Sequence, residues 1–251
     1  MEKEELLFRK RMQELAEVCF RRDVPTNSEF LNLNEQTIFQ NISGTLPPVR
    51  YTLSGGFESS ERKVVCFLPS YEEELTDPPY TCICIQPVNR RFAEELSHRD
   101  YLGAIMNLGI ERSLLGDIVI KDGDAYIFVL KKMSRYLADN ITTIRHTTVQ
   151  ASVIDDPGEI LKPEYEEING TVSSIRLDSI VALCGRLSRS KAAAYIESEK
   201  VFINGQMIPQ VSRIMKDGEI ISVRGIGKYK YVGSGGQTKK GRISVTLLKY
   251  K

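Results

Sequence analysis

The spacing of apolar residues predicts helices and strands from the start of the chain. Four apolar residues recur at helical spacing in the first twenty positions: Phe8, Met12, Leu15 and Cys19. This pattern predicts an amphipathic helix, and a second helix is predicted around residues 28–40. The apolar runs VRYTL and KVVCFLPS flank a turn-rich stretch and are typical of strands. We therefore expect residues 1–78 to form an N-terminal domain of helices and strands, an α/β unit.

Between residues 79 and 156 the pattern becomes regular. Strand-like and helix-like segments follow in the order β-α-β-β-α-β: YTCICIQPV, HRDYLGAIMNLGI, GDIVI, AYIFVL, KKMSRYLADN and HTTVQASVI. This order predicts a ferredoxin-like domain, similar to an RNA-recognition motif (RRM-like), with two helices on one face of a four-stranded sheet. Asp122-Gly123 predicts a tight hairpin. Tyr126 and Phe128 share one face of a strand, and we expect them to pack in the core.

The last part of the chain has a different pattern. Residues 157–172 are acidic and contain proline, which predicts an exposed linker. Two helices are then predicted over residues 176–185 and 189–198, followed by short strands around Asn204-Gly205 and a basic C-terminal hairpin. The expected fold class is thus α+β, with a C-terminal domain over residues 173–251.

The second of these helices, RSKAAAYIES, has an unusual charge order. Ser188 is suited to cap its first turn, and small residues such as Ala192 permit close packing against the preceding helix. Arg189 and Lys191 lie at the positive end of the helix dipole, where each forgoes about 0.3 to 1 kcal/mol. A bound phosphate would reverse the sign of that cost, whereas the alternative is a solvated basic surface.

Net charge separates the two parts of the chain. From Thr171 to Lys251 there are 15 Lys and Arg against 5 Asp and Glu, a net charge of +10, while the preceding residues carry 19 against 28, a net charge of −9. A basic block of this size favours a polyanionic partner such as nucleic acid. Five scattered cysteines suit reduced thiols, and the sequence has neither an apolar membrane span nor a secretory signal. We expect a cytoplasmic protein.

The basic block carries a resemblance to a known family. The segment SIRLDSIVALCGRLSRSKAAAYIESEKVFINGQMI, with the later DGEIISVRG, resembles the S4 RNA-binding domain. Two upstream segments, GGFESSERKVVCFLPSY and HRDYLGAIMNLGIERSLLGDI, are similar to the YlmH family of bacterial S4 proteins. This resemblance implies rescue of stalled large ribosomal subunits that still hold peptidyl-tRNA, and genetic proximity to cell-division functions.

The resemblance also implies an RNA-facing groove formed by the helix pair and the following loop. The residues expected to bind RNA are Arg176, Asp178, Arg186, Arg189, Ser190, Lys191, Lys200, Asn204, Gly205 and Arg224. One departure is Glu199, which stands where many S4 domains have glycine. The expected partners are rRNA or tRNA and the large ribosomal subunit, without a membrane or a small-molecule cofactor, and we expect a monomer.

Catalytic signatures are weak in this sequence. The Gly185-Arg186-Leu187-Ser188 segment has Ser where the pseudouridine synthase signature has its catalytic Asp, and glycine-rich methyltransferase loops and tRNA-synthetase signatures are missing. Neither His98 nor His146 is placed beside a nucleophile by any motif, and no Cys or His set has metal-ligand spacing. We therefore expect no catalytic residue, cofactor or metal, and a non-catalytic RNA-binding protein. The alternative is an RNA-modifying enzyme whose S4 domain binds the substrate.

Overall fold

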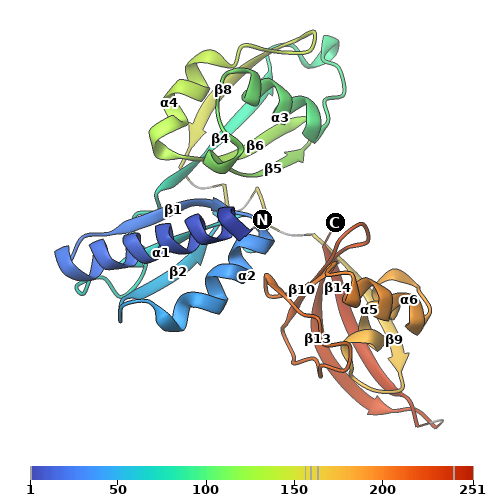
Figure 1. Ribbon diagram of the computed structural model, residues 1–251. Helices are drawn as coiled ribbons and strands as arrows, with labels where there is room; N and C mark the ends of the chain where they lie inside the picture. The colour runs from blue at the N-terminus through green and yellow to red at the C-terminus, as the bar shows by residue number, and fades with distance from the viewer. Residues whose placement is uncertain (1, 156, 159, 163, 240, 251) are drawn as a thin grey trace. The chain divides into compact units, whose positions relative to one another are not determined.

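The computed structural model describes residues 2–155, 157, 158, 160–162, 164–239 and 241–250, which form helices and strands joined by turns. The chain divides into two units, Met1–Lys162 and Pro163–Lys251 (Figure 1). Both units mix helices with antiparallel sheets, so the predicted α+β class is confirmed. In the described part of the chain, no helix is long and apolar enough to cross a membrane.

The first unit begins with a small sheet covered by helices. Its elements are α1 (Glu2–Arg22), β1 (Thr26–Leu31), α2 (Leu33–Ile42), the 3₁₀ turn η1 (Ser43–Thr45), β2 (Arg50–Ser54) and β3 (Lys63–Leu68). The strands pair antiparallel in the order β1-β3-β2. Met12, Leu15 and Cys19 of α1 are buried against a cluster that includes Phe39 and Phe67, which confirms the predicted helical stripe.

The predicted second helix starts too early. Residues 28–31 belong to strand β1, and α2 begins only at Leu33. The reason is a capping box: the Asn32 side chain accepts hydrogen bonds from the N–H groups of Asn34 and Glu35, while Glu35 accepts one from the Asn32 N–H. Asn32 therefore ends the strand and starts the helix.

The ferredoxin-like prediction is confirmed. The elements are β4 (Tyr80–Pro87), η2 (Arg90–Phe92), α3 (His98–Asn107), η3 (Arg112–Leu114), β5 (Leu115–Lys121), β6 (Asp124–Leu130), α4 (Lys131–Asn140), β7 (Thr143–Ile144) and β8 (Thr147–Ile154). The antiparallel sheet has the order β5-β6-β4-β8-β7, with α3 and α4 on one face (Figure 1). Asp122 and Gly123 both have positive φ, at 53° and 83°, as the predicted tight hairpin requires.

The other face of this sheet packs against the N-terminal sheet. Cys82, Tyr126 and Phe128 share one buried cluster with Phe30 and Val64. The predicted core role of Tyr126 and Phe128 is therefore confirmed. Two domains were expected here, over residues 1–78 and 79–156, but they share a hydrophobic cluster and lie within one unit.

Gly116 lies at a close approach between these two sheets. A Cβ atom at this position would lie 2.7 Å from Phe30 Cε1 and 2.8 Å from Phe128 Cβ. Hydrogen bonds from Arg62 also join the two sheets. Arg62 Nη2 donates to the Phe30 carbonyl over 2.7 Å, and Arg62 Nε donates to the Leu115 carbonyl over 2.8 Å. The sheet face on which an RNA-recognition motif stacks bases is thus occupied by the protein itself.

The second unit places two helices on a six-stranded antiparallel sheet. Its elements are β9 (Tyr165–Val172), α5 (Leu177–Gly185), α6 (Arg189–Glu197), β10 (Val201–Ile203), β11 (Gln206–Met207), β12 (Ile220–Val223), β13 (Gly227–Gln237) and β14 (Ile243–Tyr250). The strand order is β11-β10-β12-β13-β14-β9. Buried residues from both helices and from the sheet form one core, which includes Tyr229 and Tyr231. The predicted helix pair and the C-terminal hairpin β13–β14 are present.

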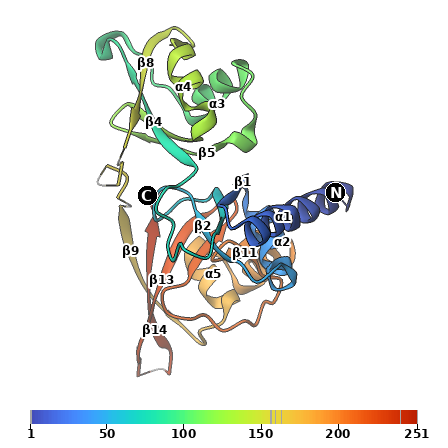
Figure 2. The ribbon, with the colours of Figure 1, turned by 90° about the vertical axis from the view of Figure 1, so that its left-hand side faces the viewer.

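The expected linker over residues 157–172 needs correction in its second half. Residues Tyr165–Val172 form strand β9, which pairs with β14 along its whole length, as Figure 2 shows. Ile168 and Val172 face the core, and the residues beside them in the strand are polar. The two-residue repeat of a strand is therefore present in this segment, although its acidic composition is typical of a linker. Lys249 also pairs with Glu166 over 3.7 Å. The domain therefore includes residues N-terminal to the expected boundary at 173.

Candidate nucleic-acid interface

A buried carboxylate organises the start of the helix pair. Asp178 Oδ2 accepts a hydrogen bond from Arg189 Nη2 over 2.6 Å, and its Oδ1 lies 3.4 Å from Arg176 Nε. The Ser179 N–H donates to the same Oδ1 over 2.9 Å. Asp178 is 5% exposed, whereas the side chains of Arg189 and Arg176 are 52% and 39% exposed. Three of the expected RNA-binding residues thus form one cluster, in which both arginine side chains are partly exposed.

The pKa of the Asp178 carboxyl lies below its ordinary value of 3.8. Burial alone would raise this pKa, but the hydrogen bond from Arg189 and the charges of Arg189 and Arg176 outweigh burial. The carboxylate is therefore ionised near neutral pH. Because an ionised carboxylate only accepts hydrogen bonds and repels other anions, Asp178 is not suited to bind a phosphate directly, and its contacts instead hold Arg189 and Arg176.

The predicted cap of the second helix is confirmed. The Ser188 Oγ accepts a hydrogen bond from the Lys191 N–H over 3.3 Å and lies 3.0 Å from the Ser190 Oγ. Arg186 ends α5 in a left-handed conformation, with φ 50° and ψ 42°. Arg186, Ser190 and Lys191 are all exposed. The turn between the helices thus presents two cations and a hydroxyl to solvent.

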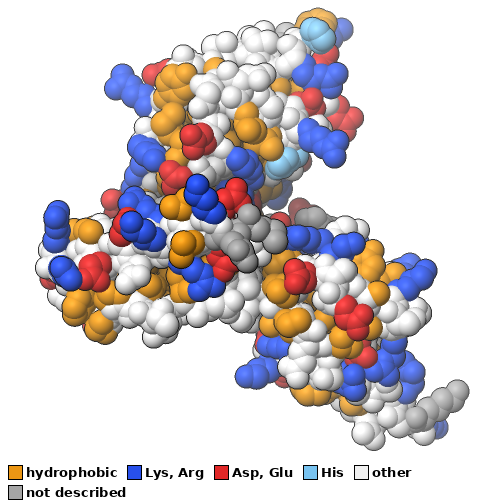
Figure 3. Space-filling model, viewed as in Figure 1, with side chains coloured by type: hydrophobic (Ala, Val, Ile, Leu, Met, Phe, Trp, Pro, Cys, Tyr) orange, Lys and Arg blue, Asp and Glu red, His pale blue; other side chains and the backbone are white. Residues whose placement is uncertain are grey.

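The electrostatic cost predicted for Arg189 at the start of α6 needs correction. A carboxylate of the fold already faces this guanidinium, so part of the predicted electrostatic cost is offset by Asp178. Arg186 and Lys191 differ, because no carboxylate partner for either is found among the described residues. In Figure 3, Lys and Arg side chains lie around the helix pair of this unit. The prediction that cations near the start of α6 are available to a bound phosphate therefore applies to Arg186 and Lys191.

A second group of expected residues lies around strand β10. At one end of the strand, the Lys200 carbonyl accepts from the Arg224 N–H over 2.9 Å. The Lys200 ammonium lies 5.4 Å from the centre of the Tyr195 ring, and the Arg224 guanidinium lies 4.9 Å from that of Phe202. These two cations rest on aromatic rings at a strand end, and both side chains are exposed.

Asn204 and Gly205 lie at the opposite end of β10. Their φ angles of 51° and 81° form the tight turn into β11. The Asn204 Oδ1 accepts from the Ile220 N–H over 2.9 Å, so this oxygen is used to join β10 to the start of β12. Both residues therefore shape a hairpin.

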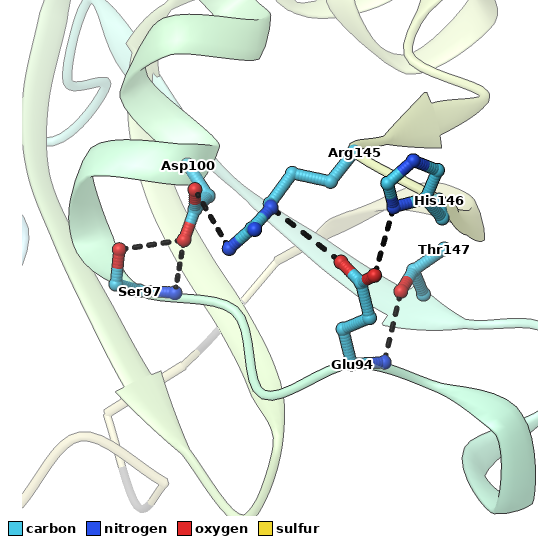
Figure 4. Close-up of polar contacts among 6 residues, drawn as sticks. All are labelled: Glu94, Ser97, Asp100, Arg145, His146 and Thr147. Carbon is cyan, nitrogen blue, oxygen red and sulfur yellow. Dashed lines mark hydrogen bonds and ion pairs between the residues drawn. The ribbon is translucent and has the colours of Figure 1, made fainter.

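Figure 4 shows a polar cluster in the first unit that has the residue types of a catalytic site. Arg145 lies in the two-residue loop between β7 and β8, with φ 52°. Its Nη1 lies 3.6 Å from Asp100 Oδ1, and Asp100 Oδ2 accepts from the Ser97 N–H and Oγ over 2.8 and 2.6 Å. This part of the cluster caps α3 and holds the loop, so the Ser97 hydroxyl is committed to Asp100.

The other half of the cluster pairs Glu94 with His146. Their Oε1 and Nδ1 atoms are 2.8 Å apart, and the His146 side chain is 84% exposed. The Glu94 N–H donates to Thr147 Oγ1 over 3.0 Å. Within the described contacts, no Ser, Thr or Cys side chain is hydrogen-bonded to His146, so the arrangement lacks an activated nucleophile.

Thiol and metal chemistry find little support in this fold. All five cysteines are free and buried, and burial raises the pKa of the Cys66 and Cys82 thiols to about 12. Such thiols stay protonated at neutral pH and are poor nucleophiles. Among the described residues, no group of three or more His, Cys, Asp or Glu side chains is arranged to hold a metal ion.

Comparison with known proteins shows the following similarities. Residues 83–156 match a family model described as "Putative RNA-binding domain in YlmH". The ribosome-associated protein quality control protein P2 of Bacillus subtilis (strain 168) is 30% identical over 228 residues, which cover 89% of this chain and 87% of that protein. The structure of cell division protein ylmH from Streptococcus pneumoniae is similar over 60% of this chain and 91% of that chain, with a TM-score of 0.49 and 25% identity.

The family model lies on the ferredoxin-like domain, which the sequence analysis left without a role. Charge gave no signal there, because residues 83–156 carry 9 Lys and Arg against 10 Asp and Glu. The β-α-β-β-α-β order was the one available hint, since RNA-recognition motifs share it. Every predicted site residue lies in the other unit, so the sequence predicted no site residue in the domain that the family model covers.

Proposed function

The chain belongs to the YlmH family, and from this membership we propose that it is a non-catalytic RNA-binding protein of the ribosome. Its partner is structured RNA of the large ribosomal subunit, together with tRNA held there. The finer role that we propose is rescue or quality control of large subunits that carry stalled peptidyl-tRNA. A ribosomal partner also implies that the protein works in the cytoplasm.

One observation carries the proposal: the fixed cationic surface where α6 begins. Arg189 and Arg176 are oriented by the buried Asp178, and the exposed Arg186 and Lys191 flank them. Paired RNA offers mainly phosphates, 2′-hydroxyl groups and shape to a protein. Preorganised cations suit such a ligand because less side-chain entropy is lost on binding. The net charge of +10 from Thr171 onward adds long-range attraction.

The absence of catalysis is part of this proposal. Glu94 and His146 form the arrangement closest to a catalytic pair, and they are explained by the loop that they hold. The buried thiols are protonated at neutral pH. We therefore assign the protein a role in RNA binding without catalysis.

Sedimentation with ribosomal particles tests the proposal. The full chain is mixed with salt-washed bacterial large subunits, small subunits and free tRNA, and the bound fraction is measured after centrifugation through sucrose. We expect binding to large subunits, strengthened when peptidyl-tRNA is present. Equal binding to large and small subunits would contradict the proposed partner.

A second experiment tests the enzymatic alternative. Total RNA from a strain that lacks the protein is incubated with the purified chain and S-adenosylmethionine, and modified nucleotides in rRNA and tRNA are compared with those of the parent strain. We expect the same modifications with and without the protein. A modification that disappears in the deletion strain and returns in vitro would replace binding with catalysis.

A further inference from the structure

The ferredoxin-like domain cannot stack bases on its sheet. Its helix-free face is closed by the N-terminal sheet, and the Phe57 ring stacks on Phe128 at a centroid distance of 5.4 Å. Phe128 and Tyr126 are 2% and 8% exposed. The opposite face is covered by α3 and α4. Any nucleotide bound by this domain must therefore meet its edges, its loops or the outer surface of its helices.

Most cations of the domain are already used by the fold. Ion pairs join Arg90 to Asp124, Lys131 to Asp77, Lys132 to Glu29, Arg135 to Asp139, and Arg145 to Glu94 and Asp100. Arg112 and Lys121 donate to backbone carbonyls. Arg91 and Arg99 are the two arginines of residues 83–156 whose guanidinium groups have neither a carboxylate partner nor a hydrogen bond to a backbone carbonyl among the described residues.

Arg91 lies beside an exposed aromatic ring. Its guanidinium carbon is 5.8 Å from the centre of the Phe92 ring. The Phe92 side chain is 76% exposed, the largest value among the exposed large apolar residues of the described chain. Val88, in the same loop, is 59% exposed. A planar cation and an open ring therefore lie side by side at the C-terminal end of strand β4.

The loop that carries this pair is held in place. Arg90 Nη2 donates to both carboxylate oxygens of Asp124 over 2.8 Å, and Arg90 Nη1 donates to the Asp122 carbonyl over 2.7 Å. Asp124 is 5% exposed and also accepts from Gln86 Nε2 over 2.6 Å.

The loop backbone is fastened as well. The Asn89 Oδ1 accepts from the Arg91 N–H over 3.1 Å, and the Val88 N–H donates to the Thr148 carbonyl over 3.0 Å. The exposure of Phe92 is thus built into an ordered turn, which reduces the entropy lost when a ligand binds.

We propose that Arg91 and Phe92 form a stacking site for an unpaired RNA base, as a second RNA contact of this chain. The base lies on the Phe92 ring, and the Arg91 guanidinium binds the adjacent phosphate or the second face of the base. Unpaired nucleotides are the part of RNA that aromatic rings and guanidinium planes recognise. The match of residues 83–156 to an RNA-binding family model favours RNA as the occupant. The inference rests on the proposed function, because it requires that the chain binds RNA.

The chain has no tryptophan, which allows a direct test. The variant F92W carries a single tryptophan at the proposed site, and Y71W carries one at an equally solvent-accessible aromatic position of the same unit, where Tyr71 is 66% exposed. Bulk bacterial tRNA, which has unpaired loops, and a blunt RNA duplex are titrated into each full-length variant. We expect tRNA to quench F92W fluorescence, the duplex to leave it unchanged, and Y71W to respond to neither.

Affinities of side-chain variants identify the kind of contact. F92A and F92L should each bind tRNA about tenfold more weakly, since stacking on an aromatic ring contributes energy of that order. F92W keeps an aromatic ring and should bind tRNA more tightly than F92A and F92L do. If F92L keeps full affinity, or if F92W stays unquenched while labelled tRNA is saturated, the stacking site is wrong. If the unchanged protein binds neither tRNA nor large-subunit rRNA, the proposed function fails and this inference fails with it.

Discussion

Replacement of Asp178 by asparagine should weaken RNA binding, although it makes the protein more positive by one charge. The carboxylate is buried and receives Arg189 Nη2 at 2.6 Å, with Arg176 Nε at 3.4 Å. In D178N the amide keeps the size of the side chain but loses the charge that orients both guanidinium groups. The two arginines then rotate freely in solvent and must be ordered again when RNA binds.

The magnitude follows from two costs. Hydrogen bonds that involve a charged group contribute about 1.5 to 3 kcal/mol, so the free energy of unfolding of the C-terminal unit should fall by about 2 kcal/mol. Ordering one long side chain costs about 0.5 to 1.5 kcal/mol on binding. Loss of the fixed Arg189 orientation should therefore weaken RNA binding roughly two- to tenfold.

The matched control is E197Q, which removes one negative charge from the exposed end of α6, the helix that carries Arg189. Fluorescence anisotropy with labelled large-subunit rRNA fragments measures both affinities, and circular dichroism in urea measures stability. We expect E197Q to bind as tightly as the unchanged protein or slightly more tightly, and D178N to bind less tightly. If D178N bound as well as E197Q, Asp178 would act only through its charge, and the positioning role would be refuted.

Three further predictions concern stability. Glu199 has φ 58°, so E199G should raise the free energy of unfolding by roughly 0.5 to 1 kcal/mol in urea denaturation, and a lower midpoint would contradict the strain assigned to this turn. G116A should lower the stability of the first unit by about 1 to 3 kcal/mol, because its Cβ would meet Phe30 and Phe128. G103A, with nothing within 4 Å of its Cβ on helix α3, is the control and should be neutral or stabilising. Finally, the Glu219 carboxyl accepts hydrogen bonds from Arg213 over 2.6 and 2.9 Å and from the Lys216 N–H. Burial would raise the pKa of this carboxyl, but these contacts outweigh burial and lower the pKa below its ordinary value. The Glu219–Arg213 pair therefore stabilises the fold fully at pH values above the ordinary pKa of 4.5, and this stabilisation is lost as the pH falls through the lowered pKa. In E219Q, the free energy of unfolding measured by urea titration should therefore decrease less steeply as the pH is lowered.

The helix pair could be predicted from local pattern alone. Leu177, Ile180 and Val181 repeat at helical spacing and are fully buried, and Ser188 has the side chain that a helix start needs. The partner of Arg189 could not be predicted in this way. Asp178 lies eleven positions earlier on another helix, and its contact depends on how α5 and α6 pack. Local spacing therefore placed the cations at the start of α6, but it did not show which of them were already paired.

Strand β9 and the closed sheet face required tertiary information. The acidic composition of residues 157–172 resembled a linker, yet Ile168 and Val172 face a core that is completed by β14. In the same way, the occupant of the Tyr126 face is a different sheet, formed by residues far earlier in the chain. Periodicity shows which face of a strand is apolar, but it does not identify the surface that covers that face.

The salt dependence of RNA affinity tests the central claim most directly. Dissociation constants for large-subunit rRNA are measured over a range of salt concentrations for the unchanged chain and for the double variant R186A/K191A. The control K10A/R11A removes the same charge from the exposed face of α1. Loss of two phosphate contacts should reduce the slope of log K against log salt by about 1.4 to 1.8 in R186A/K191A and leave it unchanged in the control. An identical slope in all three proteins would contradict an RNA-binding surface where α6 begins.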